Sequence, residues 1–299
     1  MKRFGAISIA VLTIVVLIVG MAAPVSATGN NTETQLPAPI VVYGETLSQS
    51  QKEEVSSLLK VNTHEQIKEY TVTGEDLAEY INGDPNSGMY SSAKIIPQQK
   101  GKGLTIDIVT PANITQVSSE MYANALLTAG VENAKVFVAS PVKVTGHSAL
   151  SGIYKAYDAE GKQLDKERMI LANDELDVAT DLAGKEGLSQ EEVSRLLTEI
   201  KKAIAEQNPA TKEEVEQIVK EQLNALGISL SESDRQMLID LFNRMRNLNI
   251  DFNQVQSQLE DIAAKVEDKL GEIVNDEGFW NKVQDFINNL LNLLKGLFS

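Results

Sequence analysis

The segment VTGHSALSGIYKAY, residues 144–157, places a histidine and a serine side by side at a turn. It follows the apolar run AKVFVAS (134–140), so we expect the order strand, turn, helix, in which serine hydrolases present their nucleophile. That turn requires Gly-x-Ser-x-Gly because it leaves no room for side chains beside the serine, yet Leu150 occupies the last position. A triad of that chain order also needs a later histidine, and His147 is the last one in the chain. We therefore predict no catalytic role for Ser148, and the sequence names no other catalytic residue.

The same turn has a structural interpretation and a binding interpretation. In the first, Thr145 caps the helix, and the small residues that follow let the helix approach a sheet closely. In the second, the backbone amides at the helix start, next to a histidine, hold an anion, because helix N-termini attract negative charge. The sequence therefore gives one candidate anion or ligand site, formed by Thr145, Gly146, His147 and Ser148.

Acidic residues offer a second kind of chemistry. Glycoside hydrolysis uses a pair of carboxylates whose separation is a three-dimensional property, and the chain has 42 acidic residues. The pairs Glu75 with Asp76 and Asp158 with Glu160 look like helix caps or solvated groups. They leave hydrolysis open as an alternative.

Metal and cofactor motifs are incomplete. Residues 84–88 and 249–260 resemble calcium loops, but the glycine that such a loop requires is displaced in the first and absent from the second. The absence of cysteine and the presence of only two histidines argue against zinc, and neither standard glycine-rich phosphate loop occurs. We predict no metal and no cofactor.

The N-terminal segment predicts export. Residues 1–27 combine two basic residues, an apolar run and small residues before a cleavage point, as in a secretory signal peptide. An uncleaved membrane anchor is the alternative, because the apolar run approaches the length that spans a bilayer. Residues 28–38 are polar and we expect them to be disordered. The predicted location is the extracytoplasmic side of the cell envelope.

Charge and cysteine content restrict the partners. Removing residues 1–27 leaves 25 basic and 42 acidic residues, a net charge of −17. Nucleic acids and anionic lipids are therefore poor partners, since both are bound mainly through clustered lysine and arginine. An exported chain without cysteine has no disulfides and depends on its core, which fits a bacterial envelope.

Two regions differ in their patterns. Residues 39–160 alternate short β-rich runs with helical segments, which predicts an α/β domain on a mixed sheet. Within it, the glycines of QKGKG predict a hairpin between strands at 89–98 and 103–110. Residues 161–299 repeat capped amphipathic helices with short breaks, which predicts an antiparallel helical domain.

Helix starts are expected where a capping residue and an acidic partner stand three residues apart. These pairs are Ser50 with Glu53, Thr73 with Asp76, Ser189 with Glu192 and Thr211 with Glu214.

The last helix, expected over 279–298, is strongly amphipathic. Its apolar face includes Trp280, Phe286, Leu290 and Leu294, and we predict that it binds the rest of the protein or a partner helix. Peripheral membrane contact is less favoured because the polar face carries few basic residues. Self-association is a further alternative.

Three blocks carry a resemblance to a known family. They are EMYANALLTAG (120–130), VFVASPVKVTGHSALSGIYKAY (136–157) and RMRNLNIDFNQVQSQL (244–259). With the capped acidic helices around them, they resemble the YpuA-like exported proteins of Gram-positive bacteria, grouped as domain of unknown function 1002. The resemblance spans nearly all of the mature chain and implies an extracytoplasmic protein, but no catalytic residue.

These observations predict an exported envelope protein that acts by non-catalytic binding or scaffolding. Its partner would be an unidentified envelope protein or a wall component. The alternative is a wall-polymer hydrolase that uses acidic residues of the α/β domain.

Overall fold

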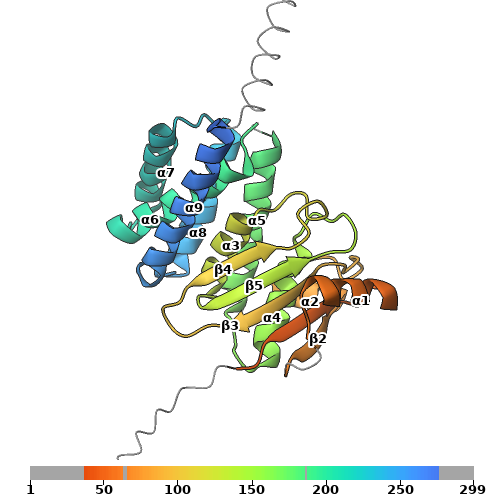
Figure 1. Cartoon of the computed structure of the whole chain (residues 1–299). Helices are drawn as coiled ribbons and strands as arrows, with labels where there is room; N and C mark the ends of the chain where they lie inside the picture. Colours follow the sequence, from red (N-terminus) through yellow and green to blue (C-terminus); the bar gives the residue numbers. More distant parts are fainter. Residues whose placement is uncertain (1–36, 63–65, 186, 276–299) are drawn as a thin grey trace, which may run out of the picture. The chain divides into compact units, whose positions relative to one another are not determined.

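A mixed β-sheet lies at the centre of the described part of the chain. The computed structural model describes residues 37–62, 66–185 and 187–275. Within them, five strands are arranged in the order β2-β1-β3-β5-β4 (Figure 1). In chain order they are β1 (Ile40–Gly44), β2 (Lys68–Val72), β3 (Ser92–Pro97), β4 (Leu104–Ile108) and β5 (Ala134–Ala139). β1 pairs with β2 and β4 with β5 in parallel, whereas β3 is antiparallel to β1 and β5. The predicted fold class, an α/β fold with a mixed sheet followed by helices, is confirmed.

The hairpin expected between residues 89–98 and 103–110 is wrong, because β5 lies between β3 and β4. β5 is mostly buried, whereas β4 alternates between buried and more accessible positions, as an edge strand with one solvated face does. The Oδ1 of Asn133 accepts hydrogen bonds from the amides of Gly101 (2.7 Å) and Gly103 (3.3 Å). These bonds hold the glycine turn against the start of β5, so that β4 pairs with the edge of β5 opposite to β3.

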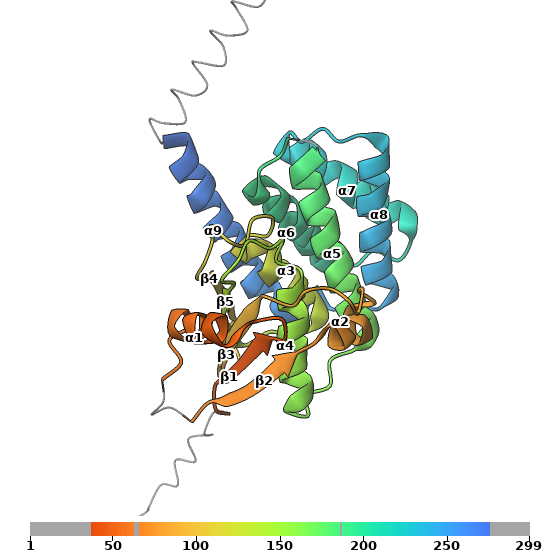
Figure 2. The ribbon, with the colours of Figure 1, turned by 90° about the vertical axis from the view of Figure 1, so that its right-hand side faces the viewer.

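Different helices cover the two faces of the sheet. They are α1 (Gln49–Leu58), α2 (Gly74–Ile81), α3 (Ser119–Ala129) and α4 (Ser148–Ala159). α1 packs on one face, where Val55 joins a small cluster with Val41 and Tyr43. α3 and α4 pack on the other face, with α2 beside α4, and Figure 2 shows α1 and α4 on opposite sides of the strands.

The helix starts agree only in part with the expected caps. Thr73 caps α2, as expected, since its Oγ1 accepts a hydrogen bond from the amide of Asp76 at 3.1 Å. The cap expected at Ser50 with Glu53 is wrong, because α1 is capped two residues earlier by Ser48 together with Gln51. Leu47 packs into the cluster under α1, which fixes where this helix begins.

The second half of the described chain is helical. Its elements are α5 (Lys166–Lys185), α6 (Gln190–Gln207), α7 (Lys212–Leu226), α8 (Glu232–Asn247), the short 3₁₀ helix η1 (Phe252–Val255) and α9 (Gln256–Asn275). The expected capping boxes at Ser189 and Thr211 are present, and α6 and α7 end in left-handed residues at Asn208 and Gly227. Such residues end helices because the left-handed backbone satisfies the last carbonyl groups.

α5 connects the two halves. It packs against α2 and α3 on one side and against α6 and α8 on the other. One apolar cluster runs from Ile40 in β1 to Val266 in α9. The division into domains at residue 160 stays a prediction. Among the described residues, no helix combines the length and the apolar character needed to cross a membrane.

Candidate functional site

The turn before α4 is held in place by a hydrogen bond from a buried tyrosine of α3. Gly146 has a backbone φ of +114°, and its carbonyl oxygen accepts a hydrogen bond of 2.6 Å from the buried hydroxyl of Tyr122. A Cβ atom at Gly146 would lie 2.6 Å from that same hydroxyl. Burial raises the pKa of Tyr122, so its hydroxyl remains a donor. The position therefore requires glycine.

Thr145 does not cap α4, contrary to the structural interpretation of the sequence. The helix begins at Ser148, and no side chain caps it. The Thr145 Oγ1 instead lies 3.2 Å from the Nδ1 of His147. The tight turn at Gly146 makes this contact, because it brings two side chains of the same loop together.

His147 joins this turn to α5. Its Nε2 lies 3.0 Å from the Oδ1 of Asp177, an ion-pair distance, although the two groups lack the alignment of a hydrogen bond. The Oδ2 of Asp177 accepts a hydrogen bond of 3.0 Å from the Nδ2 of Asn173, one turn earlier in α5. A hydroxyl, an imidazole and a carboxylate thus follow one another in space.

These groups line a surface hollow of about 410 Å³, which we name the Thr145 hollow. α2 and the loop after it form one wall, the start of α4 a second, and α5 a third (Figure 2). Its polar lining includes Asp84, Ser87, Thr145, His147, Ser148 and Asp177. Three of the four predicted site residues therefore share one hollow, and Gly146 shapes it from beneath.

The hollow lies at the edge of the sheet where α/β proteins bind ligands. β1, β2, β4 and β5 point in one direction, so their carboxyl ends meet at one edge. The loop from β5 to α4 leaves the sheet at this edge, and the loop from α2 enters β3 there. In open α/β sheets, ligands bind beyond the carboxyl ends of the strands.

Two carboxylates decide the charge of the hollow. Asp84 accepts hydrogen bonds from the amide and side chain of Asn86, which lower the pKa of its carboxyl group. Asp177 lies on another wall and is more than half exposed. Two acidic side chains thus line the hollow, which suits a neutral or cationic ligand better than the anion that the sequence predicts. The anion site stays a prediction.

The predicted carboxylate pairs have other contacts. Asp76 completes the capping box of α2 by accepting a hydrogen bond of 2.9 Å from the amide of Thr73, and it accepts another of 2.8 Å from Lys155. Glu160 accepts a hydrogen bond of 2.6 Å from Lys68, which lowers the pKa of its carboxyl group. Asp158 accepts one from the hydroxyl of Tyr80 at 3.2 Å. The geometry gives these acids structural roles.

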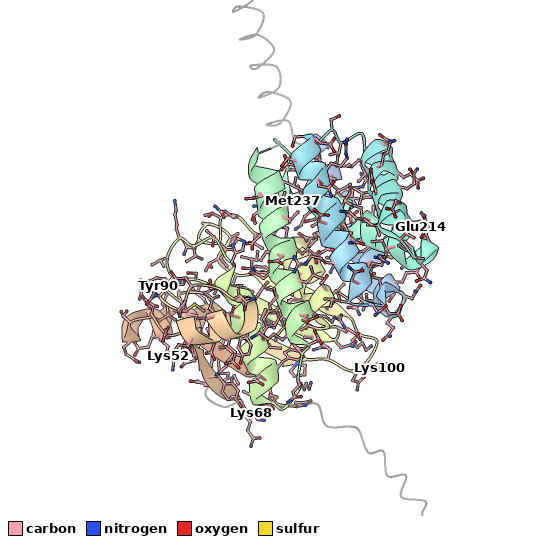
Figure 3. All side chains as sticks on the ribbon, turned by 180° about the vertical axis from the view of Figure 1, so that it is seen from behind. Lys52, Lys68, Tyr90, Lys100, Glu214 and Met237 are labelled. Carbon is pink, nitrogen blue, oxygen red and sulfur yellow. The ribbon has the colours of Figure 1, made fainter. Side chains whose placement is uncertain are left out.

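A larger hollow of about 610 Å³ lies between α5 and α8, where Figure 3 shows Met237. Its apolar side includes Val178 and Leu241, and Asp174 and Arg244 at its rim form an ion pair of 2.6 Å. It contains no histidine and none of the predicted site residues.

One polar cluster is buried completely. The Nζ of Lys201 lies 2.5 Å from Glu175 and 2.8 Å from the carbonyl of Asn124, and Glu175 also accepts a hydrogen bond of 2.6 Å from Thr128. Burial lowers the pKa of Lys201, and the charge of Glu175 opposes this effect. Since the Lys201 and Glu175 side chains are 0% and 1% exposed, the cluster is closed to ligands.

Sequence reasoning identified the turn but missed Asp84 and Asp177. Asp177 lies 30 positions after His147 in an ordinary helical segment, and only the packing of α5 against the turn brings the two together. No group of three or more histidine or acidic side chains in the described residues is placed to hold a metal. The predicted partner-binding residues Trp280, Phe286, Leu290 and Leu294 lie outside the described residues.

Comparison with known proteins gives a family but no activity. A family model described as protein of unknown function (DUF1002) matches residues 43–262. The chain is 34% identical over 270 residues to the "Uncharacterized protein YpuA" of Bacillus subtilis (strain 168), covering 87% of this chain and 89% of that protein. No solved structure matches the chain. The Thr145 hollow lies entirely within the part that the family model covers.

Proposed function

We propose that this chain, which belongs to the DUF1002 family of proteins of unknown function, is an exported envelope protein that binds a small polar ligand in the Thr145 hollow. Since the family gives no activity, the proposal rests on the geometry of the site. The observation that carries this proposal is the convergence of three walls. The turn at Thr145, the loop containing Asp84 and the α5 residue Asp177 are distant in sequence, yet they line one hollow. Sites of this kind combine an apolar surface with a few placed polar groups.

The lining indicates the class of ligand. Asp84 and Asp177 supply acceptors, Thr145 and Ser148 supply hydroxyls, and Leu77 is one of the apolar residues beside them. A neutral or cationic sugar unit matches this lining, because its hydroxyl or ammonium groups donate hydrogen bonds while its ring covers apolar surface. Such units occur in wall polymers, which agrees with the predicted location. Binding to a protein partner through residues 279–298 stays a separate prediction.

The test is a titration of the isotopically labelled chain, followed by NMR, with glucosamine, N-acetylglucosamine and inorganic phosphate. We expect one of the two sugars to shift the amide signals of Thr145, Ser148 and Asp177. Asp177→Asn should weaken binding about tenfold, since a hydrogen bond to a charged group contributes about 1.5–3 kcal/mol. Asp181→Asn, one turn further along α5 and exposed, is the matched control and should bind normally.

The result that would contradict the proposal is an absence of shifts at these amides with both sugars. Equal weakening by Asp177→Asn and Asp181→Asn would also contradict it, because the effect would then be general electrostatics. Shifts with phosphate alone would favour the anion site that the sequence predicts.

A further inference from the structure

We infer that Thr145, His147 and Asp177 form a hydroxyl–imidazole–carboxylate relay that makes the Thr145 hydroxyl a nucleophile toward small neutral acyl esters. The inference rests on the proposed function for the place where the ligand binds, and it adds a reaction. It also differs from the serine elbow considered for the sequence, because the hydroxyl belongs to Thr145 and the carboxylate comes from α5.

The relay has the order that a hydroxyl nucleophile needs. The Oγ1 of Thr145 lies 3.2 Å from the Nδ1 of His147, and the Nε2 on the other side of the ring lies 3.0 Å from Asp177. Nucleophilic hydroxyl groups are activated by a base within hydrogen-bond reach, and that base is oriented by a third group. Asn173 donates to the second oxygen of Asp177 and so holds the carboxylate in place.

The carboxylate also determines which nitrogen of the neutral ring carries the proton. A proton on Nε2 faces Asp177, so the neutral ring keeps its lone pair on Nδ1, the atom next to the Thr145 hydroxyl. The contact between Nε2 and Asp177 is not aligned as a hydrogen bond. Catalytic hydrogen bonds are often loose in ligand-free structures and tighten when substrate binds.

The reaction balances with water as the co-reactant. Nδ1 of His147 takes the Thr145 proton while Oγ1 forms a bond to the acyl carbon. The ester C–O bond breaks, and the alcohol leaves with the proton from His147. Water then gives a proton to His147 and its oxygen to the acyl carbon. The bond between Oγ1 and the acyl carbon then breaks, the acid departs, and Thr145 regains its proton from His147.

The surroundings restrict the substrate. The hollow holds about 410 Å³, so it admits a small acyl group, and Leu77, Ile81 and Val144 provide apolar contact. Asp84 and Asp177 repel an anionic acyl group.

A purely structural role is the competing explanation. The contact between His147 and Asp177 would then only join the turn to α5, and Thr145 would be an ordinary exposed residue. Reactivity of the hydroxyl separates the two, because a structural pair gives Thr145 no unusual nucleophilicity.

The experiment treats the full chain with a fluorophosphonate probe, maps the labelled residue by mass spectrometry and follows hydrolysis of p-nitrophenyl acetate. We expect the label on Thr145, with labelling and hydrolysis lost in Thr145→Val and His147→Gln. Asp177→Asn should lower the hydrolysis rate at least tenfold, since the imidazole ring loses the carboxylate that orients it. Asp181→Asn is the matched control and should keep both activities.

The inference is overturned if no label appears, if the label lies on another residue, or if it persists in folded His147→Gln. Thermal unfolding of every variant identifies changes caused by misfolding. If sugar binding is intact but Thr145 is unreactive, the relay fails alone. If neither binding nor labelling occurs, the proposed function fails with it.

Discussion

At the scale of single residues, the fully buried polar cluster around Lys201 is structural. Lys201 in α6 and Glu175 in α5 form a fully buried pair, and Asn124 and Thr128 of α3 complete its hydrogen bonds. A buried pair seldom adds much net stability, because both charges lose their hydration. Its partners fix how α3, α5 and α6 are positioned against one another. We regard this cluster as the device that specifies their register.

Replacing one member of this pair should be costly. Lys201→Met leaves the Glu175 carboxylate buried without its cation, and we expect the free energy of unfolding to fall by about 3–5 kcal/mol. Lys212→Met, which breaks the exposed pair with Asp240, is the control and should cost at most about 1 kcal/mol. Urea denaturation measures both. Similar losses in the two variants would show that the buried pair has no special role.

The double variant Lys201→Met with Glu175→Leu tests the cause. It removes both charges, so it should be more stable than Lys201→Met alone. If the double variant were less stable than the single one, the loss would come from packing and not from an unpaired charge.

At the scale of elements, the start of α4 depends on α3. Tyr122 of α3 donates to the Gly146 carbonyl, and a side chain at Gly146 would collide with the same hydroxyl. The loop that carries the Thr145 hollow is therefore held at Gly146 by a neighbouring helix and at Val144 by backbone hydrogen bonds with Asn113 and Thr115. Its shape depends on these tertiary contacts as well as on the glycine.

A double-mutant cycle should reveal this coupling. Tyr122→Phe should lower the free energy of unfolding by about 0.5–1.5 kcal/mol, because it removes one buried hydrogen bond while the Gly146 carbonyl keeps its bond from the amide of Ala149. Gly146→Ala should cost more, since it adds a collision to a left-handed backbone. In the double variant the collision with the hydroxyl is gone, so its loss of unfolding free energy should be smaller than the sum of the losses in the two single variants. Additive losses, measured by urea denaturation, would refute the contact.

The elements also show what the sequence could predict. The caps at Thr73 and Ser189 were predictable because a cap and its partner lie three residues apart. The cap of α1 was misplaced because Ser48 and Ser50 both fit the pattern, and the contacts of Leu47 decide between them. The hairpin was wrong because a turn signal does not reveal a later strand that inserts between its arms.

Only the part of the site that is local in sequence could be predicted. A histidine and hydroxyl groups at a turn are visible in one short segment, and three of these residues do share a hollow. Asp177 comes from α5 and Asp84 from the loop after α2, so their presence depends on tertiary packing. The sign of the charge in the hollow was missed with them.

At the scale of the whole molecule, the core crosses the expected domain boundary. α3 is buried along nearly its whole length, because the sheet covers one side and α5, α6 and α9 cover the rest. Cutting the chain near residue 160 would expose apolar residues of α3 such as Leu127.

We therefore expect residues 37–160 not to fold alone. The isolated fragment should lack a cooperative thermal transition by circular dichroism and should bind a hydrophobic dye, while the full chain unfolds cooperatively. A fragment with a sharp transition and dispersed NMR signals would instead support two independent domains.

β5 also sets the order in which the sheet can assemble. β3 and β4 are complete by Ile108, but the strand that separates them ends only at Ala139. During synthesis, the edges of β3 and β4 that β5 later covers are unpaired until β5 has been made. Unpaired strand edges can pair with other strands. The nearest partner of β3 is then β4, through the glycine turn. If β3 and β4 pair during this interval, that pairing has to open before β5 can enter between them.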